Sequence, residues 1–391
     1  MNRRLPERQE PNRLARLLEG KRRAGRHVLD LTVTNPTTVG FAPLAANLID
    51  RLSSPALASY EPLPAGLGAA RSAVAEQLST LDRRVAPERV FLTASSSEAY
   101  AHLFRLLCDG GDRIAVPRPS YPLLEPIARL EDVRLDRYRL AFDGRWRLDL
   151  DSLEAAVGPR TRALVVVEPN NPTGSVLSAD ERLAVEDLAA RHGIAIISDE
   201  VFREFPWRAG TTLPSWVGTE RTPTFVLGGI SKSCGLPQLK LGWIALDGPA
   251  NAIRQYASGL EWILDLFLSV GTPVQFLLPH LLEERDTFQT ELLGRLRSNL
   301  GMWREWGARN GAAVLDADGG WSAMVRFDSV AAAGRDPAEW ALEQTDVLLH
   351  PAHFYDLDDD RHVVTSLIVK PAELAEALLR LTHGMKSLRE A

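Results

Sequence analysis

The sequence predicts an α/β protein in which a large domain, with a mostly parallel central sheet flanked by helices, is joined to a smaller α+β domain. Between residues 89 and 247, short apolar runs alternate with helix-like segments, which is typical of parallel strands with crossover helices. After Pro279 the pattern changes to a long helix, hairpin-like strands and a last helix. We expect an N-terminal arm and part of the small domain in 1–44, the large domain in 45–285, and the small domain in 286–391.

The composition excludes several classes of protein. Of the 391 residues, 45% are hydrophobic and 25% are charged, which is unlike disordered, collagen-like or coiled-coil chains. A net charge of −6 gives no electrostatic reason to expect a nucleic-acid partner. Two cysteines supply neither a disulfide framework nor a zinc site, and the eight histidines are scattered, so no metal site is expected.

The most apolar region, residues 260–278, does not have the pattern of a membrane span. It contains Glu261, Asp265, Pro273 and Gln275, and is therefore expected to be core or interface. No apolar segment follows the N-terminal arginines, so a targeting peptide is not expected. Together with the low cysteine content, this predicts a cytoplasmic protein without a membrane partner.

The elements follow from the spacing of apolar residues and from turn signals. In the first part of the chain we expect a helix at 12–25, an extended segment at 28–33 and a helix at 69–79. A strand, helix, strand unit is expected to follow, with strands at 90–93 and 113–116 and the helix at 95–108. Ser95, Ser96 and Ser97 lie at the start of the helix in that unit. Free backbone N–H groups there can hold a phosphate, although simple capping of the helix is the commoner reason for serines at this position.

A second unit places three polar residues at the ends of successive strands. Buried strands are expected at 163–167, 194–197 and 224–227, and Ser178 with Glu181 forms a capping box for a helix after the first of them. Asn171, Asp199 and Lys232 follow these strands. The carboxyl ends of parallel strands share one edge of the sheet, where open α/β folds bind their ligands.

Lys232 stands between two serines in a Gly/Pro loop. At a strand end a lysine is partly desolvated, which favours its neutral amine and lets it attack a carbonyl. The alternative is an ordinary solvated surface lysine. Beyond this loop we expect a long helix after Pro279, then strands near 314, at 323–327 and at 363–369, and a last helix from Pro371.

These residue types match the needs of pyridoxal 5′-phosphate (PLP). This cofactor requires an amine for a Schiff base, a carboxylate at its pyridine nitrogen, a donor to its phenolic oxygen and an anion site. The Asn171–Gly174 loop, Ser198–Phe202, the Ser231–Lys232–Ser233 loop and Tyr60 with its glycine loop resemble class I/II aminotransferases of PLP fold type I. This resemblance runs over nearly the whole chain.

The resemblance implies a role for each matching residue. Lys232 is the Schiff-base lysine and proton shuttle, Asp199 pairs with the pyridinium nitrogen, Asn171 donates to the phenolic oxygen, and Tyr121 stacks on the ring. The implied phosphate site consists of Ser95, Ser96, Ser97, Ser231 and Lys240. Tyr60 would reach the phosphate of a partner subunit, which implies a homodimer with shared active sites.

Three positions depart from the family pattern. Phe202 replaces a tyrosine that donates to the phenolic oxygen, so we expect the lysine–cofactor imine to stay protonated to higher pH. Lys240 replaces an arginine, which exchanges a bidentate fork for a point charge. Val364 stands where the arginine for the substrate carboxylate is expected, so either Arg361 substitutes for it or the substrate is not an ordinary α-amino acid.

The function implied is transfer of an amino group from an amino donor to a 2-oxo acid, with Asn35, Asn171 and Arg361 as expected substrate contacts. A lyase, racemase or amine oxidase of the same fold is the main alternative. A PLP-sensing regulator is the other, although the chain before Tyr60 has no room for a DNA-binding module.

Overall fold

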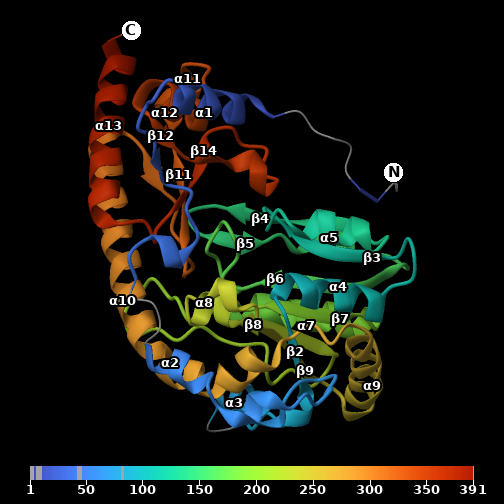
Figure 1. The fold of residues 1–391 in the computed structure, drawn as a ribbon. Coiled ribbons are helices and arrows are strands. Elements are labelled where there is room, and N and C mark those ends of the chain that lie inside the picture. The colour runs from blue at the N-terminus through green and yellow to red at the C-terminus, as the bar shows by residue number, and fades with distance from the viewer. Residues whose placement is uncertain (1–3, 6–10, 42–45, 81–82, 391) are drawn as a thin grey trace.

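The computed structural model describes residues 4–5, 11–41, 46–80 and 83–390, and its centre is an eight-stranded sheet (Figure 1). Neighbouring strands run in the order β2 (Val90–Thr93), β9 (Gly242–Asp247), β8 (Thr224–Gly229), β7 (Ala195–Asp199), β6 (Thr161–Val167), β3 (Arg113–Arg118), β4 (Arg134–Phe142) and β5 (Trp146–Leu148). β9 and β5 are antiparallel to their neighbours and the other pairs are parallel, which confirms the mostly parallel sheet. The first predicted strand, β2, is an edge strand beside β9 and does not pair with β3.

Both faces of this sheet are covered by helices, because its strands are apolar on both sides. Leu164 and Val166 of β6 pack into one hydrophobic cluster, and Val165 packs into another on the opposite face. The first cluster includes side chains from α3 (Gly68–Leu78), α6 (Leu150–Ala156) and α7 (Ala179–His192). The second includes side chains from α4 (Ser96–Leu107), α5 (Leu124–Leu130) and α9 (Ala250–Phe267). The predicted capping box of Ser178 and Glu181 is present at the start of α7.

A second lobe is built on a four-stranded antiparallel sheet. Its order is β10 (Ala313–Val314), β11 (Ser322–Arg326), β14 (His362–Ser366) and β13 (His350–Pro351), accompanied by α11 (Asp328–Ala332), α12 (Pro337–Thr345) and α13 (Pro371–Glu390). The N-terminal segment joins this lobe: α1 (Arg13–Arg23) contacts α12, and β1 (Leu29–Asp30) pairs with β12 (Val347–Leu348). Leu29 and Leu31 are buried in the same core as Trp303 and Phe327.

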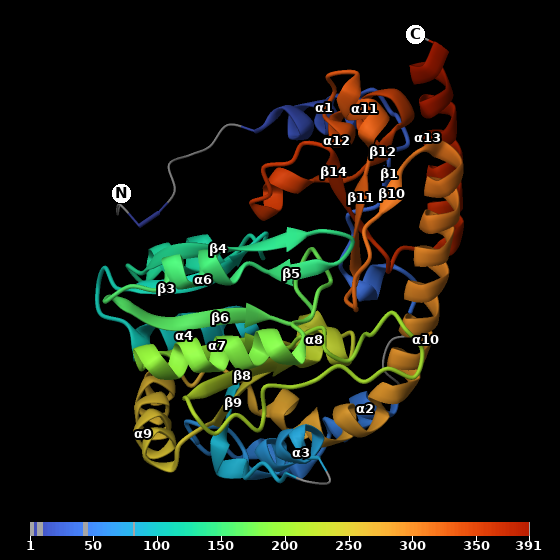
Figure 2. The ribbon, with the colours of Figure 1, turned by 180° about the vertical axis from the view of Figure 1, so that it is seen from behind.

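The two lobes are linked by α10 (Thr272–Asn310), which runs along one side of the molecule (Figures 1 and 2). The helix begins seven residues before Pro279, so the expectation that it starts after this proline is wrong. Val274, Leu277 and Leu278 are buried, and their packing holds the helix in spite of the proline. The predicted domain boundary at residue 285 falls inside α10, the boundary at 44 lies outside the described residues, and the division into domains remains a prediction. The short helix α2 (Ala46–Arg51) precedes α3.

Within the described ranges, the helices include none that is both long and apolar enough to cross a membrane. The same ranges contain no cluster of three or more His, Cys, Asp or Glu side chains suited to a metal ion.

Candidate active site

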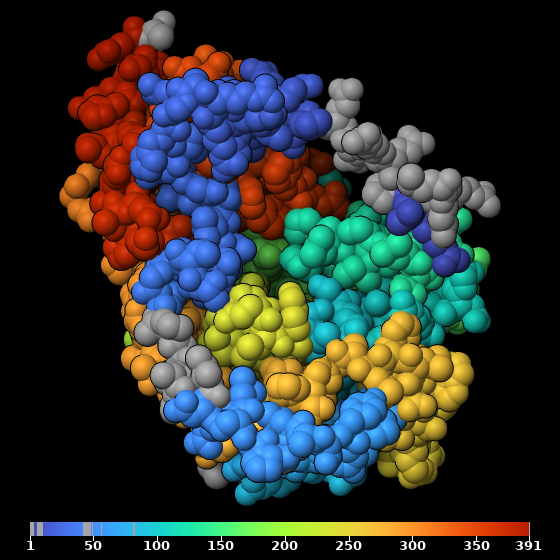
Figure 3. Space-filling view, viewed as in Figure 1, coloured from blue at the N-terminus to red at the C-terminus, as the bar shows by residue number. Residues whose placement is uncertain are grey.

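Lys232 lies in α8 (Ile230–Ser233), a single helical turn that begins directly where β8 ends. Figure 3 shows the yellow-green surface of this region between the blue N-terminal segments, the teal surface near α4 and the red C-terminal lobe. Burial lowers the pKa of Lys232 to about 8, and the nearby Asp199 carboxylate partly offsets this effect. About one amine in ten is therefore neutral at pH 7, far more than for a solvated lysine. A solvated surface position is excluded.

Asp199 is the last residue of β7, beside the strand that carries Lys232. Burial raises its pKa to about 6. Two donors favour the charged form: the backbone N–H of Val201, 3.2 Å from Oδ1, and the Tyr100 hydroxyl, 3.0 Å from Oδ2. The carboxylate is thus mostly ionised at pH 7 although it is buried, which suits a partner carrying a proton on nitrogen.

Two aromatic rings form the wall beside the lysine. The Nζ atom of Lys232 lies 5.5 Å from the ring centroid of Phe202 and 4.9 Å from that of Trp321. The two rings meet edge to face at 5.6 Å. Trp321 belongs to the turn before β11, so the small lobe closes this side of the site.

Tyr121 lies near both Asp199 and Ser97, the third of the predicted serines. Burial and the Asp199 carboxylate raise the pKa of Tyr121, and a hydrogen bond with Ser97 acts in the opposite direction. Ser95 is the N-cap of α4 and its Oγ accepts from the backbone N–H of Glu98 at 3.1 Å. The capping interpretation is therefore correct for Ser95, and the backbone N–H groups at this helix start still point toward the same end of the sheet.

Lys240 lies in the connection between β8 and β9, after α8 and a short 3-10 helix, Pro237–Leu239. Gly242 packs against the start of α4, since an added Cβ would lie 3.0 Å from the Ser95 carbonyl carbon and 3.1 Å from the Ser96 nitrogen. Lys240 precedes it by two residues, is exposed, and has a left-handed backbone with φ of 57°. Ser231 is half-buried beside Lys232. Lys240 is thus two residues from the point where this connection packs against the first turn of α4.

Asn171 lies in the loop after β6, whose Glu168 N–H donates to the Asp199 carbonyl at 2.9 Å. Its neighbour Asn170 holds the loop, with Oδ1 accepting from the Thr173 hydroxyl at 3.1 Å. The Asn171 side chain is half-buried at the same edge as Asp199. Asn171, Asp199 and Lys232 therefore lie at or just after the carboxyl ends of the neighbouring parallel strands β6, β7 and β8.

Tyr60 and Asn35 are exposed and their expected roles remain predictions, whereas Arg361 lies apart from Lys232. Tyr60 is 71% exposed, and Asn35 is exposed with its Oδ1 accepting from the Thr37 N–H and hydroxyl. Arg361 pairs with Asp359 at 2.6 Å, just before β14. The antiparallel register places it beside Phe327, six residues and roughly 20 Å along the strand from Trp321. The structure does not bring Arg361 to Lys232.

Two contacts were missed by the sequence-based prediction. Tyr100 lies on α4 among apolar residues, and only the general rule that a buried tyrosine needs a partner could have singled it out. Trp321 follows two glycines in a turn that was recognised, but nothing in the sequence shows that this turn faces Lys232.

The donor set fits PLP on its chemistry. A lysine with a lowered pKa, a buried ionised carboxylate and a half-buried asparagine share one sheet edge, and a helix start with a nearby cation adjoins them. An aldehyde, a protonated ring nitrogen, a phenolic oxygen and a phosphate would each meet a suitable group.

The solved structures identify the fold class. Alanine aminotransferase from Pyrococcus furiosus superimposes with a TM-score of 0.85 at 22% identity, covering 96% of each chain. N-succinyldiaminopimelate aminotransferase from Mycobacterium tuberculosis gives 0.79 at 25% identity, covering 95% of this chain and 96% of the other. The fold is therefore that of aminotransferases of fold type I, as predicted.

The sequence comparison then gives the family. The family model for aminotransferase class I and II matches residues 26–335, and the chain belongs to this family. Nicotianamine aminotransferase B of Hordeum vulgare is 34% identical over 243 residues, covering 60% of this chain and 44% of the relative. S-alkyl-thiohydroximate lyase SUR1 of Arabidopsis thaliana is 32% identical over 242 residues, covering 61% and 52%. The chain thus spans about half the length of the curated relatives it matches first.

Proposed function

We propose that this protein is a PLP-dependent aminotransferase that moves an amino group from an amino donor to a 2-oxo acid. The observation that carries the proposal is the placement of Lys232, with its lowered pKa, beside the buried carboxylate of Asp199 at one sheet edge. Membership of the aminotransferase family supports it. When bound, PLP supplies an electron-accepting ring that stabilises the charge left when a substrate C–H bond breaks.

We assign a separate role in this reaction to each residue of the site. Lys232 would hold the cofactor, and its Nζ atom would accept and return the substrate proton. Asp199 would favour a protonated ring nitrogen, and Tyr100 holds the carboxylate in position. We assign Tyr121 to the ring face, Asn171 to the phenolic oxygen, and the α4 start with Ser231 and Lys240 to the phosphate. Phe202 and Trp321 exclude water beside the amine.

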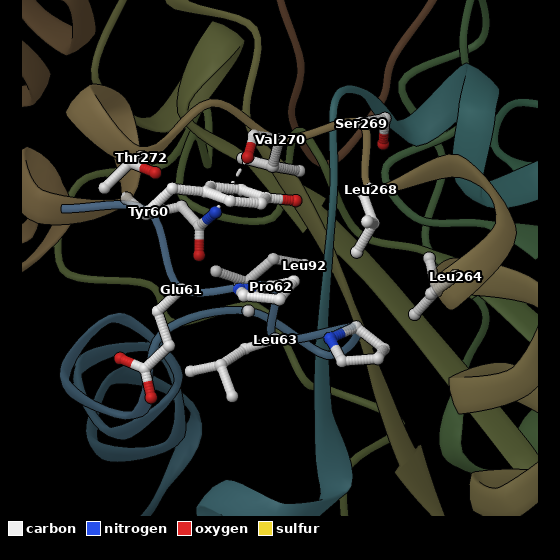
Figure 4. A pocket seen from close by; sticks show the side chains of 13 residues that line it. Tyr60, Glu61, Pro62, Leu63, Leu92, Leu264, Leu268, Ser269, Val270 and Thr272 are labelled. Carbon is white, nitrogen blue, oxygen red and sulfur yellow. Dashed lines mark hydrogen bonds between the residues drawn. The ribbon is translucent and has the colours of Figure 1, made fainter.

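A homodimer is part of the proposal. The end of α9 exposes three large apolar side chains, Trp262, Leu266 and Phe267, with 69%, 64% and 49% of their surface accessible, and exposed apolar faces often mark protein–protein contacts. Beside it lies a pocket between the Tyr60 loop and the α9–α10 connection, where Tyr60 and Thr272 lie on one side and Leu264 and Leu268 on the other (Figure 4). Ser269 of this connection donates to Glu98 in the first turn of α4 at 2.8 Å, so this surface adjoins the proposed phosphate site.

Analytical ultracentrifugation tests the dimer. We expect the wild type to sediment as a dimer and a Trp262→Glu, Leu266→Glu double variant to sediment as a monomer with weakened PLP affinity. Leu183→Glu, at a similarly exposed leucine on α7, is the matched control and should remain dimeric. A wild-type monomer with full activity would contradict both the dimer and the proposed role of Tyr60. The cytoplasmic location rests only on composition and is likewise proposed.

A lyase is the second candidate, because one relative of comparable identity is named as a lyase. The reaction with the amino donor alone distinguishes an aminotransferase from a lyase. With an amino donor alone, an aminotransferase changes the absorbance of the bound cofactor and forms one equivalent of oxo product without free ammonia. Steady release of ammonia with no acceptor present would favour the lyase and overturn the proposal.

A further inference from the structure

The position expected to hold the carboxylate-binding arginine lies in a row of three paired residues. Val364 of β14 is directly opposite Met324 of β11 on one side and His350 of β13 on the other. Residues directly opposite each other in antiparallel strands project to the same face of the sheet. Val364 and Met324 are buried in the cluster that also contains the large-domain core. The row therefore faces the large domain, and its polar member is His350.

His350 is joined to the site through Tyr355 of the short helix η5 (Ala352–Tyr355). The Tyr355 hydroxyl lies 3.1 Å from Nδ1 of His350. The carbonyl of Tyr355 accepts from the backbone N–H of Ser120 at 3.0 Å, and Tyr121 contributes to the raised pKa of Tyr355. Tyr355 thus lies between His350 and the tyrosine that we assign to the ring face.

The charges around this row do not suit an anion. Burial lowers the pKa of His350, and the Asp30 carboxylate is the charged group that partly offsets this, so His350 is neutral at pH 7. Asp30 itself accepts from the Thr32 N–H and hydroxyl, at 2.9 and 2.6 Å. In the part of the chain that the structure describes, no lysine or arginine forms a hydrogen bond or ion pair with His350, Tyr355 or Asp30. Arg361 lies outside the row, with Asp359.

We propose that the amino donor presents an uncharged, hydrogen-bond-accepting group to His350 and Tyr355, in place of a free carboxylate. When Tyr355 donates to Nδ1, the Nε2–H of His350 is left to donate to such a group. A carboxylate here would be buried against valine and methionine beside the Asp30 carboxylate, where no lysine or arginine of the described residues is paired with the row to compensate for lost hydration. This proposal rests on the proposed aminotransferase function and narrows its substrate class to amines such as amino-acid amides or esters.

The same argument applies to the acceptor. A 2-oxo acid would be held on this row by single hydrogen bonds and not by a guanidinium fork. We therefore expect 2-oxo acids to work as acceptors with a high KM. The enzyme should then be more selective among amino donors than among acceptors.

The test compares matched donors on the wild-type holoenzyme, for example L-phenylalanine and L-phenylalaninamide, by single-turnover absorbance of the bound cofactor. We expect kcat/KM for the amide to equal or exceed that for the acid. A higher kcat/KM for the acid overturns this inference while leaving the aminotransferase function intact. Transfer from neither donor, in each of several such pairs, overturns the proposed function and this inference with it.

Two variants locate the effect on the row. Val364→Arg should raise kcat/KM for the acid at least tenfold and lower it for the amide, whereas Ala333→Arg, the same charge added on the exposed surface after α11, should change neither. His350→Phe should lower kcat/KM about fivefold for the amide but leave it unchanged for phenethylamine, which has no acceptor there. Equal losses for the amide and for phenethylamine would mean a structural role for His350. If Val364→Arg does not fold, the proposal is still tested by the wild-type ratio of kcat/KM for the amide to that for the acid, and by the His350→Phe variant.

Discussion

The Tyr100 hydroxyl donates to Oδ2 of Asp199 at 3.0 Å, and both side chains are buried. Because Asp199 is buried, its charge depends on such donors, and its pKa of about 6 keeps it ionised at pH 7 only by a moderate margin. The hydrogen bond crosses from a helix on one face of the sheet to the end of a central strand. It links the packing of α4 to the electrostatics of the site.

Tyr100→Phe should weaken PLP binding about fivefold, because one hydrogen bond to a buried carboxylate is lost. The pKa of Asp199 should also rise, so PLP affinity should begin to fall at a higher pH than in the wild type, as pH is lowered through about 6. Tyr138→Phe is the matched control, since its buried hydroxyl donates to the Val165 carbonyl at 2.7 Å, away from Asp199. Equal effects of the two variants on PLP affinity, measured by equilibrium titration across pH, would contradict this role for Tyr100.

The rate at which PLP becomes attached to the apoprotein should follow the neutral form of Lys232. Its pKa of about 8 lies below the usual value, so the amine is protonated below pH 8 and neutral above it. The rate should rise nearly tenfold per pH unit up to about 7.5 and level off above 8.5. Stopped-flow absorbance measures it, with PLP ionisation determined separately. A rise that continues to pH 10 would mean an unperturbed lysine.

Phe202→Tyr should lower the pH at which the absorbance of the bound cofactor titrates. The ring of Phe202 lies beside Lys232, so a hydroxyl added there can donate to the phenolic oxygen and make it less basic. A spectrophotometric titration of both proteins measures the shift, which we expect to be about one pH unit. Phe205→Tyr, at a phenylalanine that contacts Trp321 but has no recorded contact with Lys232, serves as a control for the added hydroxyl. An unchanged or raised midpoint in Phe202→Tyr would exclude this account of the phenylalanine.

Lys240→Arg should bind PLP about fivefold more tightly, because a guanidinium group contacts two phosphate oxygens where an ammonium is a point charge. Lys386→Arg, on the last helix, controls for the substitution itself and should have no effect. Affinity is measured by titrating apoprotein at constant ionic strength. If Lys240→Ala also binds PLP as tightly as the wild type, Lys240 does not belong to the phosphate site.

Much of the large sheet could be predicted because its strands are continuous apolar runs with polar residues at their ends. Residues 163–167 are such a run, and the pattern indicates a strand that is buried on both faces. The antiparallel direction of β9 beside β2 depends instead on a register that the sequence of either strand leaves open. The start of α10 was misplaced because Pro279 is a helix-breaking signal, whereas buried contacts of Val274 and Leu278 decide the outcome.

The site could be predicted where residues follow strands, and not where the lobes meet. Asp199 and Lys232 are one step along the sheet from each other, so strand order alone brings them together. Trp321 and His350 come from the second lobe, and their place beside the site depends on how α10 connects the two parts. Arg361 is only three residues from the expected position, Val364. It nevertheless lies before the first residue of β14, at the end of the strand that is far from Trp321.

Reduction of the holoenzyme with borohydride, followed by peptide mass spectrometry, tests the central claim most directly. We predict one PLP-derived group per chain, attached to the peptide that contains Lys232, and no attachment in Lys232→Arg. Attachment to a different lysine, or a wild-type protein that takes up no PLP, would contradict the account.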